Sequence, residues 1–206
     1  MSILATGAVL AGGLSSRFGS NKALAPWAGG KLIESVTDRL LDIFPEVLVV
    51  AKNPDQYSFL KKPRLEVVPD GMACVHPLAG LASALDHART EYAFVCGCDM
   101  PFLSRKLIER LWEEAPGHMA VAPVWGGRVQ PLCAFYSKGC AKLIPGMIAD
   151  GLGPRALLER VRTRRLSEEE VRSADAEGLS LLDLDTPQDY ETYRIGGQPY
   201  RKRSIP

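Results

Sequence analysis

Residues 10–22 read Leu-Ala-Gly-Gly-Leu-Ser-Ser-Arg-Phe-Gly-Ser-Asn-Lys and continue an apolar run at residues 3–10. The apolar run predicts a buried strand, so the two adjacent glycines fall where the chain leaves a sheet. Glycine lets the backbone pass close to a polyphosphate with its N–H groups turned inward, while Arg17 and Lys22 add positive charge for the anionic oxygens. The stretch therefore predicts a phosphate-binding loop after the first strand.

Two familiar phosphate loops do not fit this stretch. A dinucleotide-binding fingerprint requires G-x-G-x-x-G, and a Walker loop requires serine or threonine after the lysine, whereas Ala23 follows Lys22. A glycine-rich surface turn with solvated basic residues is the plainer alternative. The pair of cations and the position after a strand favour the phosphate loop.

Along the rest of the chain, apolar runs bounded by turn residues alternate with segments of helical period. This alternation predicts an α/β fold with a mainly parallel sheet. Strands are expected at residues 3–10, 47–51, 65–68, 92–96, 119–124, 129–136 and 179–184. Helices are expected at residues 32–44, at residues 78–88, after a cap at Ser104, and after the capping-box sequence Thr186-Pro187-Gln188-Asp189.

Length and charge limit the domain organisation and the partners. The chain has 206 residues, with 25 Lys and Arg against 24 Asp and Glu. We expect one three-layer α/β/α domain over residues 1–206, in which residues 196–206 form a flexible basic tail. A net charge this close to zero provides no global attraction for nucleic acid or an anionic membrane, so we expect neither partner and a locally built phosphate site.

The cysteines and the N-terminus indicate a compartment. Five cysteines without a C-x-x-C pair predict neither a disulfide framework nor a zinc ribbon. The first residues lack the basic start and long apolar stretch of a signal peptide, and no apolar run reaches the length of a membrane span. We therefore expect a soluble cytoplasmic protein.

Three acidic residues lie where strands or a helix are expected to end or begin. Asp99 follows the strand at residues 92–96, and Asp70 follows the strand at residues 65–68. Ligands of open α/β sheets bind at the carboxyl ends of the strands, where a carboxylate can hold magnesium. The alternative for Asp99 and Asp70 is a turn role. Asp185 precedes the capping box, and a metal-ligand role and a helix-end role are both open for it.

The pattern L-A-G-G-x-x-x-R-x-G-x-x-K after an N-terminal strand resembles the signature of nucleotidyltransferases of the molybdenum cofactor guanylyltransferase type. The resemblance spans nearly the whole chain and implies a Rossmann-like fold of the nucleotide-diphospho-sugar transferase type. The further matching stretches are Val68-Pro69-Asp70, Pro77-Leu78-Ala79-Gly80, Cys98-Asp99-Met100-Pro101-Phe102, Gln130-Pro131-Leu132-Cys133-Ala134-Phe135-Tyr136 and Asp183-Leu184-Asp185-Thr186-Pro187.

This resemblance implies an activity and a set of site residues. GTP would be the co-substrate and Mg2+ the cofactor, and the terminal phosphate of molybdopterin would receive GMP, giving molybdopterin guanine dinucleotide and pyrophosphate. Catalytic roles fall to Lys22, Arg17 and Asp99, and metal binding to Asp99 and Asp185. Nucleotide-binding roles fall to Leu10, Ala11, Gly12, Gly13, Lys22, Asn53, Asp70 and Asp99. Many guanylyltransferases carry a polar residue where this chain has Ala51, so that contact is either lost or moved to Asn53.

Other functions remain as alternatives. A relative that uses CTP, or another small phosphorylated acceptor, would share the phosphate loop, and a nucleotide-binding or carrier domain would keep the pocket without turnover. We expect a monomer or weak oligomer, with molybdoenzyme maturation proteins as possible partners. His76, His87 and His118 form no ligand motif, and Cys96 and Cys98 are expected to be inert buried thiols.

Overall fold

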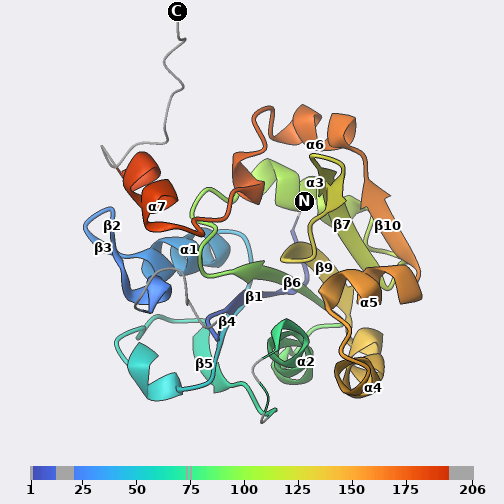
Figure 1. Ribbon diagram of the computed structural model, residues 1–206, viewed down its shortest axis with the longest axis horizontal. Helices are drawn as coiled ribbons and strands as arrows, with labels where there is room; N and C mark the ends of the chain where they lie inside the picture. Colours follow the sequence, from blue (N-terminus) through green and yellow to red (C-terminus); the bar gives the residue numbers. More distant parts are fainter. Residues whose placement is uncertain (1, 13–20, 73, 75, 195–206) are drawn as a thin grey trace, which may run out of the picture.

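The computed structural model describes residues 2–12, 21–72, 74 and 76–194, and these residues form a sheet between two layers of helices (Figure 1). The main sheet has eight strands. They are β1 (Thr6–Leu10), β4 (Glu46–Ala51), β5 (Leu65–Pro69), β6 (Tyr92–Gly97), β7 (Ala120–Trp125), β8 (Arg128–Val129), β9 (Cys133–Ser137) and β10 (Thr163–Leu166). Their order is β10-β7-β9-β6-β1-β4-β5, with β8 paired to β7.

The sheet is mainly parallel, as predicted. Parallel pairing joins β6, β1, β4 and β5 and also joins β10 to β7, whereas β9 runs antiparallel to β6 and β7. Leu10 pairs with both Val50 and Gly97, and Val50 pairs with Val68. The carboxyl ends of four neighbouring strands therefore meet at one edge of the sheet.

Helices cover both faces of the sheet, which confirms the three-layer prediction (Figure 1). On one face lie α1 (Leu32–Leu41), α3 (Arg105–Glu113) and α6 (Glu168–Ala174), and on the other lie α2 (Pro77–His87), α4 (Ile144–Ala149) and α5 (Pro154–Arg160). Alternate strand residues feed the two cores: Val47 and Val49 belong to the first, and Leu48 and Val50 to the second. Side chains buried to this degree contribute roughly 1.5–3 kcal/mol each.

A third, smaller hydrophobic cluster attaches the C-terminal helix of the described residues to a hairpin near the N-terminus. The hairpin of β2 (Pro26–Trp27) and β3 (Gly30–Lys31) packs against α7 (Pro187–Arg194). Trp27 lies 5.6 Å from Tyr190 and 5.8 Å from Phe102 between ring centroids. The predicted capping box begins α7, because Thr186 Oγ1 accepts from Asp189 N at 3.1 Å and Asp189 Oδ2 accepts from Thr186 N at 2.9 Å.

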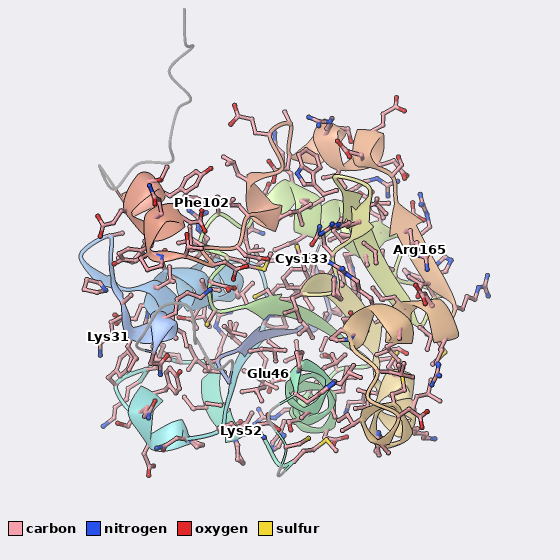
Figure 2. The ribbon with its side chains drawn as sticks, viewed as in Figure 1. Lys31, Glu46, Lys52, Phe102, Cys133 and Arg165 are labelled. Carbon is pink, nitrogen blue, oxygen red and sulfur yellow. The ribbon has the colours of Figure 1, made fainter. Side chains whose placement is uncertain are left out.

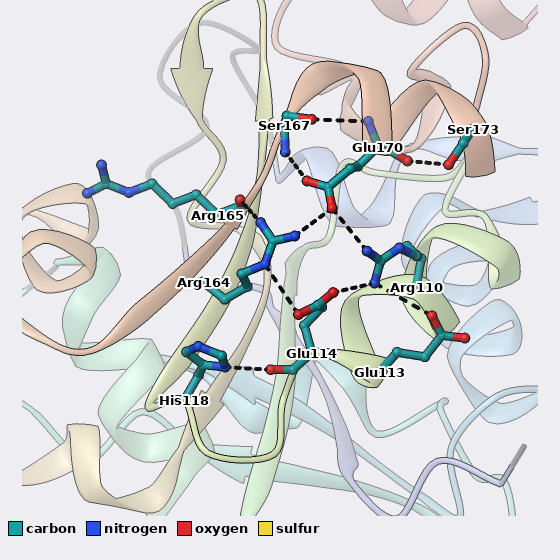
Figure 3. Close-up of polar contacts among 9 residues, drawn as sticks. All are labelled: Arg110, Glu113, Glu114, His118, Arg164, Arg165, Ser167, Glu170 and Ser173. Carbon is teal, nitrogen blue, oxygen red and sulfur yellow. Dashed lines mark hydrogen bonds and ion pairs between the residues drawn. The ribbon is translucent and has the colours of Figure 1, made fainter.

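A network of arginines and glutamates joins α3, β10 and α6 (Figure 3). Arg110 lies 2.8 Å from Glu114 and 3.0 Å from Glu170. Arg164 lies 3.2 Å from Glu114 and also pairs with Glu170. We call Arg110, Glu114, Arg164 and Glu170 the arginine network. It fastens the edge strand of the sheet to two helices.

Three details of the secondary structure differ from the predictions. Residues 179–184 form no strand. Gly178 has a φ of 65°, and Leu179–Leu181 form the 3-10 helix η4 instead. The Asp175 side chain accepts from the backbone N–H groups of Leu179 and Ser180 at the start of this helix. The strand at residues 129–136 is two strands, because the chain turns at Pro131, which has no N–H to donate.

Ser104 stands at the N-cap of α3, but its side chain makes no capping bond. Its backbone N donates instead to Ser180 Oγ at 2.8 Å. The sequence pattern also does not predict β10, α4, α5 or α6. None of the helices formed by the described residues is both long and apolar enough to cross a lipid bilayer.

Candidate functional site

The ammonium of Lys22 lies between two carboxylates from distant parts of the chain. Lys22 begins the short 3-10 helix η1 (Lys22–Leu24), and its Nζ donates to Asp99 Oδ2 at 2.7 Å and to Asp185 Oδ1 at 3.2 Å. The Lys22 side chain is 9% exposed, whereas that of Asp185 is 55% exposed. The structure thus brings the predicted catalytic lysine together with both predicted metal ligands, and the site is accessible on the side of Asp185.

The charges of this group shift two pKa values. Burial alone would lower the pKa of Lys22, but Asp99 and Asp185 outweigh it and raise the pKa above its ordinary 10.5. Partial burial of the carboxyl raises the pKa of Asp183 to about 7, with further contributions from Asp99 and Asp185, although the residue as a whole is exposed. We call Lys22, Asp99, Asp183 and Asp185 the edge cluster. Two carboxylates, those of Asp99 and Asp185, pair with the one ammonium in this cluster, so the edge cluster attracts further positive charge.

Asp99 is held in place by the end of β6. Cys98 N donates to Leu10 O at 3.2 Å, which continues the pairing of β6 with β1 beyond Gly97. A Cβ at Gly97 would lie 2.2 Å from Asp99 Oδ1. Glycine at this position therefore lets the carboxylate lie against the end of the strand.

Asp185 is positioned from the opposite end of the chain. Leu184 N donates to Asp99 O at 3.1 Å. Leu184 is fully buried in the cluster with Trp27 and Tyr190, and Phe102 of the same cluster is labelled in Figure 2. The aromatic cluster therefore seats the segment before α7 against the loop that carries Asp99, and Asp185 is the next residue.

A second charged pair, Lys52 and Asp70, lies at the ends of β4 and β5. Lys52 Nζ lies 3.0 Å from Asp70 Oδ2 and also donates to the Met72 carbonyl (Lys52 is labelled in Figure 2). Asp70 Oδ1 accepts from Met72 N at 3.3 Å and from Ser83 Oγ at 3.4 Å. The Asp70 side chain is 5% exposed and that of Lys52 is 28% exposed. Asp70 thus organises the start of the loop toward α2, and Lys52 is the more accessible partner.

Lys52 is not among the site residues predicted from the sequence. The available signal was its position directly after β4, at the same edge as the other site residues. The ion pair itself could not be predicted, because a long lysine side chain can reach many partners and the sequence does not indicate which one lies close.

The remaining predicted residues fall into three groups. Leu10 ends β1, and Gly12 lies beside the charged pair, since a Cβ on Gly12 would be 3.8 Å from Lys52 Cγ and 3.9 Å from Asp70 Oδ2. Asn53 is exposed at the N-cap of the 3-10 helix η2 (Pro54–Tyr57), two residues beyond β4. Gly13 and Arg17 lie outside the described residues, so their predicted roles stay predictions.

The side chains of the edge cluster provide a limited set of metal ligands. Within the described part of the chain, no group of three or more His, Cys, Asp or Glu side chains is arranged to hold a metal ion. Asp99 and Asp185 nevertheless share one ammonium as their partner, and Mg2+ often takes only one or two protein carboxylates when substrate phosphates complete its shell. The donor set fits Mg2+ that arrives with a nucleotide.

The thiol next to Asp99 is not a nucleophile at neutral pH. Burial, followed by the charge of Asp99, raises the pKa of Cys98 to about 12. Cys96 is fully buried, and burial raises the pKa of its thiol well above the ordinary value. Both groups therefore remain protonated, as expected of inert thiols.

Comparison with known proteins identifies a family and close relatives. The family model of the MobA-like NTP transferase domain matches residues 7–168. A probable molybdenum cofactor guanylyltransferase of Pelotomaculum thermopropionicum is 35% identical, over 93% of this chain and 92% of that protein. A molybdenum cofactor guanylyltransferase of Desulfosudis oleivorans is 31% identical, over 90% of this chain and 92% of its own length.

Solved structures extend the comparison to the fold. Molybdopterin-guanine dinucleotide biosynthesis protein A of Archaeoglobus fulgidus superposes with a TM-score of 0.79 at 28% identity, covering 92% of this chain and 96% of that one. The 2-C-methyl-D-erythritol 4-phosphate cytidylyltransferase of Thermus thermophilus has a TM-score of 0.64 at 19% identity, covering 93% of this chain and 97% of that one. The second likeness shows a shared nucleotidyltransferase fold.

Proposed function

This chain belongs to the family of MobA-like NTP transferases, and from that membership we propose that it transfers GMP from GTP to the terminal phosphate of molybdopterin, forming molybdopterin guanine dinucleotide and pyrophosphate. The observation that carries the proposal is the position of Lys22 between Asp99 and Asp185, at the edge where β1 and β6 end. Relatives matched over nine tenths of the chain bear the name of this activity.

The reaction needs positioning and charge rather than a covalent enzyme intermediate. An oxygen of the acceptor phosphate attacks the α-phosphorus of GTP, the bond from that phosphorus to the bridging oxygen breaks, and pyrophosphate leaves. Lys22 remains charged at neutral pH and would hold the anionic oxygens as charge develops on the leaving group. Arg17 is proposed to share this task. Removal of one such cation should cost roughly 2–4 kcal/mol of barrier.

Asp99 and Asp185 are the residues that would hold Mg2+. When bound, the metal supplies Lewis-acid stabilisation of phosphate charge. Surplus negative charge among the described residues of the edge cluster supports this role, since the carboxylates of Asp99 and Asp185 both pair with the one ammonium of Lys22. Asp99 is the deeper ligand, at 19% exposure against 55% for Asp185.

Gly12 and Asp70 are proposed to form the part of the site next to the nucleotide. Among the described residues, a Cβ at Gly12 would make only ordinary van der Waals contacts, and its φ lies outside the left-handed region. Packing against the described residues and backbone conformation therefore do not require glycine here, which supports a close approach by a ligand. Leu10, Ala11 and Asn53 are proposed to line the same part of the site, as is Gly13.

The proposal extends to the setting of the enzyme. We propose that residues 1–206 form a single nucleotidyltransferase domain, active in the cytoplasm as a monomer or weak oligomer. GTP and molybdopterin would be its small-molecule partners, and molybdoenzyme maturation proteins could receive the product. Nucleic acid is not a proposed partner, since the net charge of +1 offers no attraction to it.

One assay tests the proposed reaction. Purified protein is incubated separately with GTP, CTP, ATP and UTP in the presence of molybdopterin and Mg2+, and the product is identified by mass. We expect a dinucleotide with GTP and little or none with the other three. A product with CTP alone would identify the cytidylyl alternative, and bound nucleotide without pyrophosphate release would identify a non-catalytic binding domain.

A further inference from the structure

The hydroxyl of Tyr57 connects two segments that flank the proposed triphosphate site. Tyr57 ends η2, and its residue is only 1% exposed. The hydroxyl donates to Ala11 O at 3.1 Å and accepts from Asn21 Nδ2 at 3.1 Å. Ala11 precedes Gly12, and Asn21 precedes Lys22. One buried hydroxyl therefore contacts the neighbours of two residues assigned to the nucleotide.

The bond to Ala11 also orients the N–H of Gly12. The peptide between Ala11 and Gly12 is trans, and the C=O and N–H of a planar trans peptide point in opposite directions. Because the Ala11 carbonyl is directed toward buried Tyr57, the Gly12 N–H is directed away from it. The hydroxyl thereby fixes a donor that a phosphate oxygen could use.

The bond to Asn21 fixes the start of η1. Asn21 Oδ1 accepts from Ala23 N at 3.2 Å, and Nδ2 donates both to Tyr57 and to Gln56 Oε1 at 2.9 Å. Both ends of the Asn21 amide are therefore fixed. Since η1 begins at Lys22, this arrangement sets the backbone from which the Lys22 ammonium reaches Asp99.

The protonation state of Tyr57 suits this role. Burial raises the pKa of Tyr57 above its ordinary value of 10, which outweighs the lowering effect of the bond from Asn21. The hydroxyl therefore keeps its proton at neutral pH and can donate to the Ala11 carbonyl while it accepts from Asn21.

We propose that Tyr57 is a positioning residue for nucleotide binding, which acts through Ala11 and Asn21 to aim the Gly12 N–H and the Lys22 ammonium at the triphosphate. The inference rests on the proposed function, because it assigns both groups to GTP. It predicts that the Tyr57 hydroxyl affects the affinity for GTP and leaves the affinity for the acceptor unchanged.

The test uses Tyr57→Phe, which removes the hydroxyl and keeps the buried ring. We expect GTP to bind about tenfold more weakly with Mg2+ present and the KM for GTP to rise in proportion, while the KM for molybdopterin stays constant. Tyr92→Phe is the matched control, because the Tyr92 hydroxyl also donates to a backbone carbonyl, that of His118 at 3.0 Å. The control should lose similar thermal stability and keep the wild-type affinity for GTP.

A double-mutant cycle tests whether Tyr57 acts through Asn21. Asn21→Ala should also weaken GTP binding, and the Tyr57→Phe/Asn21→Ala double variant should bind GTP more tightly than the product of the two single effects predicts. Independent, multiplicative effects would contradict a shared path and overturn that part of the inference.

The outcomes separate this inference from the proposed function. If wild-type protein forms the dinucleotide and Tyr57→Phe binds GTP within about twofold of wild type, the role of Tyr57 is overturned while the reaction stands. If both KM values rise together, or if the melting temperature falls while both KM values stay constant, the hydroxyl is merely structural and the inference is also overturned. If wild type binds GTP without forming product, the proposed reaction fails, and the affinity ratio still decides the role of Tyr57.

Discussion

The edge cluster and the arginine network both gather opposite charges, yet they differ in balance and in place. In the arginine network each of the two arginines contacts both Glu114 and Glu170, and Arg110 also lies 3.6 Å from the exposed Glu113 (Figure 3). In the edge cluster Lys22 pairs with two carboxylates, Asp99 and Asp185, and the partly ionised Asp183 lies within their electrostatic influence. The first arrangement fastens secondary structure, and the second leaves negative charge for a ligand cation to offset.

Ion pairs alone therefore do not identify a functional site. Balanced arginine and glutamate pairs satisfy one another's hydrogen-bonding groups, and their pKa shifts agree with this: the bonds from Arg110 lower the pKa of Glu114, and the bond to Glu170 raises that of Arg164. In the edge cluster the pKa of Asp183 moves the other way, up to about 7. Charge removal should therefore reduce activity in the edge cluster and stability in the arginine network.

The largest effect is expected from Lys22→Ala and Asp99→Ala. Each variant should keep the fold while turnover falls by about 100-fold or more, because a charge that acts on the triphosphate is lost. Steady-state kinetics with GTP, combined with circular dichroism, measure both quantities. The ion pair of Lys62 and Asp38, which joins α1 to the segment before β5, supplies the controls Lys62→Ala and Asp38→Ala. Near wild-type turnover in a site variant would remove that residue from the mechanism.

A smaller effect on activity is expected from Gly12→Ala. The described residues leave room for the Cβ, so the melting temperature should stay near the wild-type value, while an approaching phosphate would meet the new methyl group and the KM for GTP should rise about tenfold.

Gly97→Ala provides the contrast to Gly12→Ala. Its Cβ would lie 2.2 Å from Asp99 Oδ1, so this variant should lose both stability and turnover. Calorimetric melting and GTP kinetics on both glycine variants distinguish ligand contact from internal packing. A loss of stability in Gly12→Ala would show that packing, and not the ligand, requires glycine there.

Glu114→Gln should reduce the stability of the protein without changing its activity, in contrast to the variants of the edge cluster. Glu114 contacts both arginines of the arginine network, and the bond from Arg110 lowers the pKa of its carboxyl first. Loss of its charge should cost about 1 kcal/mol of unfolding free energy, or roughly 2–4 °C in Tm for a chain of this size. The kcat and the KM for GTP should not change. A clear loss of turnover at unchanged stability would contradict a purely structural role.

The smallest expected effect is on the pH dependence of stability, because Asp183 is exposed and solvent screens its charge. Since the pKa of Asp183 is raised to about 7 in the folded protein from an ordinary 3.8, the folded state binds a proton that the unfolded state has lost between these values. The contribution of Asp183 to the free energy of unfolding is therefore fully present below about pH 4 and is lost as the pH rises through 7. In metal-free buffer, Asp183→Asn should melt above wild type at pH 8 and converge with it near pH 4. Parallel melting profiles would contradict the raised pKa.

The strands that carry the site could be predicted from the sequence, whereas the edge strand β10 and the 3-10 helix η4 could not. The β-branched run of β4 and the apolar run of β6 indicate buried strands, and their ends predict where Asp99 should lie. β10 lacks the apolar run of a buried strand, because its sequence is Thr-Arg-Arg-Leu and its Arg164 forms ion pairs with Glu114 and Glu170 from other parts of the chain. The apolar run at residues 179–184 forms the 3-10 helix η4 and not the predicted strand, because Gly178 adopts a left-handed conformation and Asp175 caps the start of the helix.

The site itself shows the same division. Lys22, Asp99 and Asp185 were predicted individually from spacing, strand ends and family resemblance, but their shared hydrogen bonds depend on elements 77 and 163 residues apart in the chain. Lys52 and Tyr57 were missed, because their roles come from tertiary contacts to Asp70 and Ala11 rather than from a local motif.

Asp99 and Lys22 are proposed to bind the same metal-bound triphosphate. Calorimetric titration of GTP into wild type and into Asp99→Asn, each with Mg2+ and with a chelator, tests this proposal most directly. We expect Mg2+ to tighten GTP binding to wild type and this gain to disappear in Asp99→Asn. An equal gain from Mg2+ in both proteins would show that Asp99 does not hold the metal.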